Sequence, residues 1–143
     1  IHEFFKVFAD KCHHAKEEDV LFPEMEKAGV LKEGGPIGVM LAEHAQGREY
    51  VKNLGDGVNK YKAGDKKTVS KITENAKMYI ELLTQHIQKE DNVLYPMADK
   101  LLSKKTQKEM FEEFEKIETE RIGAGTHEKF HELLHHLKEE YLG

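Results

Sequence analysis

The stretch HHAKEEDVLFP, residues 13–23, aligns without a gap with HIQKEDNVLYP, residues 86–96. The two copies share His, Lys, Glu, Val, Leu, an aromatic residue and Pro in the same order. Their common core is His-x-x-x-Glu, which places an imidazole and a carboxylate one turn apart on the same face of a helix. The repeat therefore predicts two similar helices whose polar side chains can converge on one point between them.

The first copy leaves a choice of register. His14 and Glu18 have the same spacing as His13 and Glu17, but only the latter pair has a counterpart in the second copy. We therefore predict that His13 and Glu17, together with the His and Glu of the second copy, form the functional set.

Apolar residues at helical spacing extend outward from both copies, and breaks rich in Gly separate them. We expect helices over residues 1–26, from Ile37 to the Ala63-Gly64-Asp65 break, from that break through Met97, from a Thr106 cap to Gly123, and from a Thr126 cap through Tyr141. Short links between long helices indicate antiparallel neighbours. The sequence thus predicts an all-α, up-down antiparallel bundle over residues 1–102, with residues 103–143 as an additional C-terminal helical extension packed on the same domain.

Composition excludes several classes of protein. The 143 residues fit one domain, and the net charge of -5, with both signs interleaved, offers no basic patch for nucleic acid. No apolar run approaches the ~20 residues needed to cross a membrane. A single cysteine, Cys12, rules out an internal disulfide, so we expect a cytoplasmic protein.

The apolar stripe of residues 37–61 contains one histidine, His44, and that of residues 72–97 contains His86 and Glu90. A lone histidine on such a stripe is often a hydrogen-bonded core residue. A buried carboxylate, however, carries a desolvation cost of several kcal/mol unless it is paired or bound to a metal ion. Three helices that each present His, two of them adding Glu, therefore predict a metal site, which we expect to be walled by Met40, Gly47, Leu83, Val93 and Met97.

The ligand types narrow the choice of metal. Imidazoles and carboxylates without a cluster of thiolates argue against a structural zinc site, and carboxylates that can bridge favour a di-iron or di-manganese centre, with iron as the first choice. Ferritin-like proteins use Glu-x-x-His on two helices. Here that spacing occurs only twice on the last helix, at Glu128 and Glu132, so it cannot form such a site alone.

These motifs together resemble the hemerythrin family in its HHE cation-binding branch. The resemblance rests on residues 13–23, on Glu43-His44 followed by Gly47-Arg48, and on residues 86–96, and it covers roughly residues 1–102. It implies two non-haem iron ions with an oxo or hydroxo bridge. It also implies that three histidines ligate iron and two glutamates bridge the pair, namely His13, His44, His86, Glu17 and Glu90.

The sequence departs from the family pattern in two ways. The family usually supplies another His from a preceding helix, which we expect to be missing here, and oxygen carriers have a second His where this chain has Arg48. His127 and His131 on the last helix could supply the missing ligand, although we favour their lying at a partly exposed helix start. They also match the zinc-peptidase pattern His-Glu-x-x-His, but too few residues follow to give a third ligand and a cleft.

We consider three functions, of which the resemblance implies the first two. We favour binding or sensing of oxygen or a related small ligand, such as nitric oxide or peroxide, at the open iron pair. The alternatives are a redox enzyme that reduces nitric oxide or peroxide or takes part in iron-sulfur repair, and a sensor whose iron controls a partner-binding helix formed by residues 103–143. The sequence does not identify a protein partner.

Overall fold

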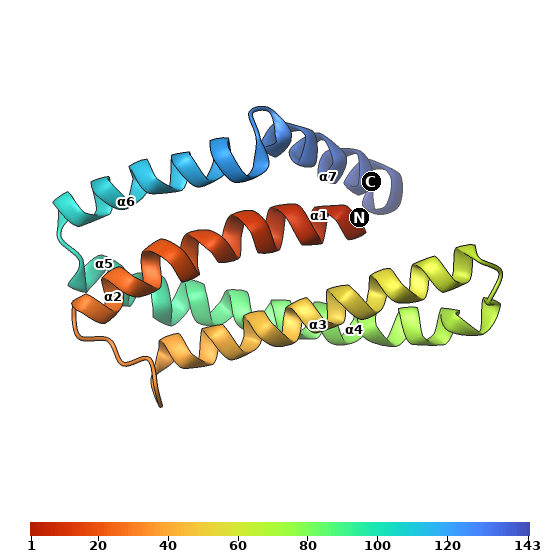
Figure 1. Cartoon of the computed structure of the whole chain (residues 1–143), viewed down its shortest axis with the longest axis horizontal. Coiled ribbons are helices and arrows are strands. Elements are labelled where there is room, and N and C mark those ends of the chain that lie inside the picture. Colours follow the sequence, from red (N-terminus) through yellow and green to blue (C-terminus); the bar gives the residue numbers. More distant parts are fainter.

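The computed structural model describes all residues, 1–143, and contains helices and turns but no strand (Figure 1). The expected all-α bundle of antiparallel helices is confirmed. In chain order its elements are α1 (His2–Phe4), η1 (Phe5–His14), η2 (Glu17–Leu21), α2 (Phe22–Lys27), α3 (Pro36–Lys62), η3 (Lys66–Thr68), α4 (Val69–Lys89), η4 (Glu90–Leu94), α5 (Tyr95–Leu101), α6 (Lys104–Ile117), η5 (Glu118–Ile122) and α7 (Thr126–Leu142).

The elements α1, η1, η2 and α2 form one continuous helical rod that carries the first copy of the repeat. In η1 and η2 the backbone bonds follow the wider π pattern, from residue i to i+5. Because a π turn holds more residues than an α turn, each successive side chain is rotated less around the helix axis. Residues at repeated steps of four, such as Glu17 and Leu21, therefore stay on the same buried face.

Helix α3 begins at Pro36, whose fixed φ suits a first helical turn, and it ends before Gly64. Gly64 adopts a φ of +105°, a conformation that other residues rarely take. The chain then reverses through η3, and α4, η4 and α5 run back beside α3 (Figure 1).

The second copy of the repeat lies across α4, η4 and α5, and η4 is again a π turn. Val93 was expected to wall the site, but it is 49% exposed, whereas Leu94 is buried. The π turn explains this correction, because the buried row continues at steps of four through Glu90, Leu94 and Ala98.

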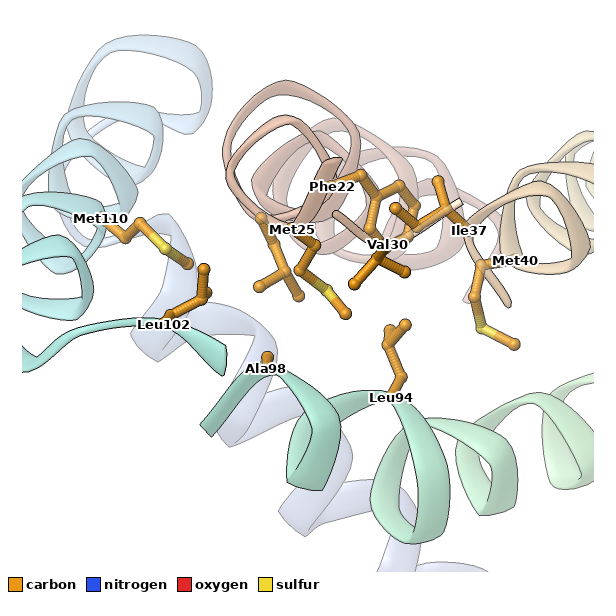
Figure 2. Close-up of a cluster of buried hydrophobic side chains, with 10 residues drawn as sticks. Phe22, Met25, Val30, Ile37, Met40, Leu94, Ala98, Leu102 and Met110 are labelled. Carbon is orange, nitrogen blue, oxygen red and sulfur yellow. The ribbon is translucent and has the colours of Figure 1, made fainter. Parts of the chain in front are cut away.

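A cluster of apolar side chains fills one end of the bundle (Figure 2). It joins Phe22 and Met25 of α2, Ile37 of α3, Leu94 of η4 and Met110 of α6. Phe22, Met25 and Ile37 are at most 1% exposed. This core holds the two copies of the repeat at a fixed distance and closes one end of the polar site.

The remaining helices, α6, η5 and α7, lie along the first rod on the side away from α3 and α4 (Figure 1). Ser103 caps α6, and its hydroxyl accepts a hydrogen bond from the Thr106 amide. Glu118 pairs with Lys16 of the rod, and Phe130 of α7 packs on Phe4. No helix of the protein has both the length and the apolar character to traverse a bilayer.

Candidate metal centre

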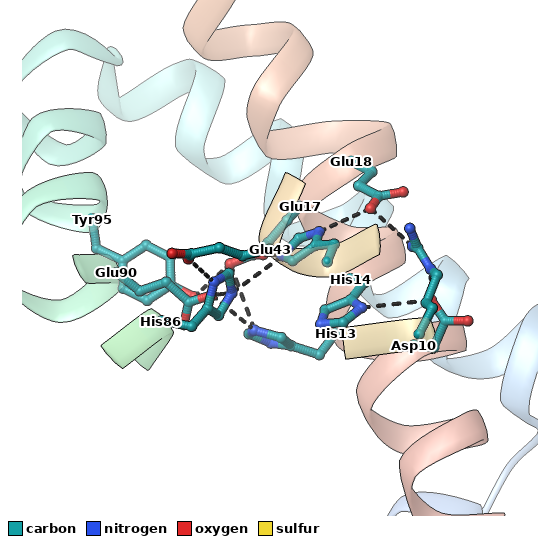
Figure 3. A network of polar contacts seen from close by, with 11 residues as sticks. Asp10, His13, His14, Glu17, Glu18, Glu43, His86, Glu90 and Tyr95 are labelled. Carbon is teal, nitrogen blue, oxygen red and sulfur yellow. Dashed lines mark hydrogen bonds and ion pairs between the residues drawn. The ribbon is translucent and has the colours of Figure 1, made fainter. Parts of the chain in front are cut away.

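Four buried donors meet between the first rod, α3 and the α4–η4 helix (Figure 3). Glu17, His44, His86 and Glu90 each offer a ligand atom, and these atoms all lie within 4.8 Å of one another. Each of the four residues is at most 3% exposed. Four of the five residues that the sequence singled out are therefore gathered at one interior point.

The imidazole nitrogens that face this point are both Nε2 atoms. His44 Nε2 lies 3.2 Å from His86 Nε2. The carboxylate oxygens lie closer to these nitrogens, with Glu17 Oε2 2.9 Å from His44 Nε2 and Glu90 Oε1 2.6 Å from His86 Nε2. Nitrogen and oxygen donors at such separations can share a cation.

The opposite nitrogen of each imidazole is held by an outer carboxylate. His44 Nδ1 lies 2.8 Å from Glu18 Oε1, and His86 Nδ1 lies 2.7 Å from Glu43 Oε2. A carboxylate on Nδ1 fixes the ring so that Nδ1 carries the proton and Nε2 presents its lone pair to the centre. This arrangement is typical of metal-ligating histidines.

The outer carboxylates are neutralised by cations, whereas the inner ones are not. Lys89 pairs with Glu43, and Arg48 donates to Glu18 over 2.8 Å. All ion pairs of the inner carboxylates, Glu17 and Glu90, are with histidines. The two inner negative charges therefore lack any Lys or Arg partner.

Glu17 makes two different contacts with its two oxygens. Tyr95 donates its hydroxyl to Oε1 over 2.8 Å. Oε2 lies close to His44 Nε2, but the angle is not that of a hydrogen bond, and Oε2 has no other partner. A buried carboxylate oxygen without a hydrogen bond is costly, and a bound cation would satisfy it.

The charges of the centre shift the pKa values of its members. Burial disfavours ionisation of Glu90, but hydrogen bonds from His13 and His86 outweigh it and hold the Glu90 pKa well below its usual range. Burial likewise opposes the charged form of His86, and bonds to Glu90 and Glu43 outweigh it and raise the His86 pKa. Burial and the charge of Glu17 raise the pKa of Tyr95, so its hydroxyl remains a proton donor.

His13, the fifth predicted ligand, lies at the rim of the centre. Its side chain is 41% exposed, and Nε2 lies 3.4 Å from Glu90 Oε1 and 3.6 Å from Glu17 Oε1. Burial opposes protonation of His13, but the bond to Glu90 outweighs it and raises the His13 pKa. His13 thus faces the two carboxylates and can reach the centre from outside.

The histidines of α7 do not reach the centre. His127 and His131 contact Phe8, with ring centroids 5.2 and 6.2 Å apart, and His131 is exposed. Neither belongs to a group of three or more close ligands, so the structure places no ligand from α7 in the centre.

Sequence reasoning missed several residues around the centre. Glu18 and Glu43 hold the imidazoles, and Tyr95 holds Glu17. His14, which the choice of register set aside, is 5% exposed and stacks on His44 with ring centroids 3.9 Å apart. The pair of adjacent histidines was the only available signal for it.

Space for a small ligand adjoins the centre. A void of about 10 Å³, lined by Gly47, Tyr79, Leu83 and the imidazoles, has room for about one water-sized molecule. A larger cavity of about 320 Å³, lined in part by Gly47, Arg48 and Tyr79, opens on the same side. Gly47 and Leu83 thus border the centre as expected.

Comparison with known proteins agrees with this geometry. The chain is 26% identical over 121 residues to an uncharacterized protein of Mycobacterium tuberculosis, a match that covers 85% of this chain and 47% of the relative. It is 36% identical over 89 residues to the iron-sulfur cluster repair protein YtfE of Yersinia pseudotuberculosis, covering 60% of this chain and 40% of that protein.

The chain thus spans less than half the length of these two curated relatives. No solved structure gives a significant match. The model of the hemerythrin HHE cation-binding domain matches residues 1–98, which include both copies of the repeat and His44. The chain therefore belongs to the hemerythrin HHE cation-binding family.

Proposed function

We propose that this chain holds a pair of non-haem iron ions and uses them to bind or sense oxygen or a related small ligand. The observation that carries the proposal is the orientation of His44 and His86. Each ring is fixed at Nδ1 by an outer carboxylate and turns Nε2 toward two inner carboxylates without a Lys or Arg partner. Only bound cations or protons can balance those charges.

The residues present fit an iron pair. Glu17 and Glu90 each offer two oxygens and could bridge two ions, while His44, His86 and His13 could each ligate one. Glu17 Oε2 is already without a hydrogen bond, so a cation would add a partner rather than break one. Iron held by these nitrogen and oxygen donors would supply the redox chemistry for binding a small ligand.

The protein itself prepares and shields the centre. Glu18 and Glu43 orient the two imidazoles, and the hydroxyl of Tyr95 positions Glu17. The core under the site, with Phe22 5.9 Å from the His44 ring, excludes bulk water from one side. The void beside Gly47 has room for about one water-sized molecule and is too small for an organic substrate.

Iron analysis and visible spectroscopy test the proposal. Protein loaded anaerobically with iron(II) should contain about two iron ions per chain. It should develop a charge-transfer band on exposure to air and lose the band with reductant. Iron-loaded protein that stays colourless in air would contradict ligand binding, and protein that retains no iron would contradict the metal centre.

A second candidate function, redox turnover, draws support from the similarity to the iron-sulfur cluster repair protein. As an enzyme, the centre would consume nitric oxide or peroxide, or deliver iron for repair, through many cycles. Steady-state consumption of nitric oxide or peroxide by the loaded protein would favour this function. Stoichiometric binding without turnover would favour ligand binding or sensing.

A further inference from the structure

One buried imidazole of the centre has no role in the ligand set so far described. His14 is 5% exposed, and its Nδ1 makes no hydrogen bond. The nearest acceptor, Asp10 Oδ1, lies 3.5 Å away outside hydrogen-bonding geometry and already accepts from Arg48 Nε over 2.6 Å. An unsatisfied buried polar group costs about 1–3 kcal/mol, so His14 would not occupy this position for packing alone.

The ring of His14 is directed into the centre. It stacks on the His44 ring with an angle of 13° between the planes, and it lies 6.3 Å from the His86 ring. Ligand nitrogens of these three histidines lie within 4.8 Å of one another. His14 also lines both the small void and the larger cavity beside Gly47.

The two copies of the repeat differ at this position. Ile87, the counterpart of His14, is 48% exposed on the outside of α4. In the first copy the π turns of η1 rotate the rod so that His14 points inward and the His13 side chain lies at the rim. At this position, therefore, the first copy places an imidazole in the interior, whereas the second copy places an exposed isoleucine.

We propose that His14 is an additional imidazole ligand of the metal pair, on the side of the centre that faces the void beside Gly47. This inference rests on the proposed function. His44 and His86 each have one free nitrogen, Nε2, because Nδ1 is taken by a glutamate. Each can therefore ligate a single ion, and His14 gives one of the two ions a second buried nitrogen donor.

Replacing His14 with an apolar residue of similar volume distinguishes a metal ligand from a histidine with a purely structural role. His14→Leu removes the unsatisfied nitrogen but keeps the volume, so the metal-free variant should melt at the wild-type temperature or higher. Its binding of the second equivalent of cobalt(II) should weaken more than about tenfold, since outer-shell partners of a ligand alone are worth about that much. The exposed His136→Leu, whose side chain is 73% exposed, is the matched control.

Chemical rescue keeps the test valid if His14→Leu folds poorly. In His14→Ala, added imidazole can enter through the larger cavity and should restore the visible cobalt(II) spectrum of the wild type. Second-site affinity in His14→Leu equal to wild type, or no rescue by imidazole, would overturn the inference. If the wild type and the His14 variants all bind two cobalt(II) ions with equal affinity, the metal centre is supported and only the role of His14 is wrong. If the wild type binds no cobalt(II), both the metal centre and the role of His14 are wrong.

Discussion

Replacing Glu43 tests whether an outer carboxylate controls the metal affinity of His86. Glu43 Oε2 accepts from His86 Nδ1 over 2.7 Å, and its other oxygen pairs with Lys89. The Glu43 side chain is 14% exposed, so water replaces these contacts only in part. Glu43→Ala therefore frees the imidazole to rotate and removes the charge that makes Nε2 a better donor.

The size of the effect follows from that one contact. Hydrogen bonds to charged groups contribute about 1.5–3 kcal/mol. Loss of an outer-shell partner of a metal ligand typically costs about 10–100-fold in affinity, or about 1.4–2.8 kcal/mol. We expect Glu43→Ala to lie near the upper end of this range. Glu43→Gln keeps an oxygen acceptor but loses the charge, so it should lie near the lower end.

Competition between the protein and a chromophoric chelator for cobalt(II) or iron(II) measures the change. Glu49→Gln is the matched control, because it removes the same charge from an exposed position of the same helix, α3. Glu18→Gln should act in the same direction through His44. A Glu43→Ala variant that binds metal within about twofold of the wild type would refute the view that Glu43 positions a ligand.

Three further predictions follow from other parts of the protein. Gly47→Ala should keep both metal ions but slow or block oxygen binding in stopped-flow spectroscopy, because the added Cβ lies 3.4 Å from Tyr79 Cε2 and takes up the void. Burial raises the pKa of Tyr79 to about 12, so the unfolded chain loses this proton first and stability should fall as pH rises above 10. In urea titrations at pH 11, Tyr79→Phe should therefore lose about 1.4 kcal/mol less unfolding free energy than the wild type. If the unfolding free energy of the variant falls as steeply with pH as that of the wild type, Tyr79 is not the group responsible. Phe22→Ala should cost about 3–5 kcal/mol of unfolding free energy, against less than about 0.5 kcal/mol for Phe111→Ala at a position that is 61% exposed.

Helical periodicity and the repeat were sufficient to predict the bundle and four positions that the structure gathers. His44, His86 and Glu90 interrupt apolar stripes, and Glu17 is the residue that aligns with Glu90 in the first copy of the repeat. The burial of these four polar side chains could therefore be predicted from the sequence. The division into a bundle of residues 1–102 and a C-terminal helical extension of residues 103–143 on the same domain stays a prediction. The source of the family's remaining histidine also stays open, although the structure places His127 beside Phe8 and not in the centre.

Other features could not be predicted from the sequence, because they depend on how the helices are rotated and not on the spacing of residues along one helix. Ideal α-helical geometry gives no sign of the π turns that bury His14 and expose Val93. Contacts of Glu18 with His44, and of Glu43 with His86, join different helices. They require the relative rotation of packed helices, which no single-helix pattern contains.

Similar sequences in the two copies do not produce equivalent surroundings for the donors of the centre. The aromatic residue of the first copy is Phe22, which packs near the His44 ring, whereas that of the second copy is Tyr95, which donates to Glu17. The Tyr95 hydroxyl donates to Glu17 over 2.8 Å, whereas the ion pairs of Glu90 are with His13 and His86. The small void next to Gly47 adjoins His44 and His86, and a separate cavity of about 360 Å³ adjoins His13, Glu17 and Tyr95. The two metal positions that the proposed function requires would therefore have different surroundings.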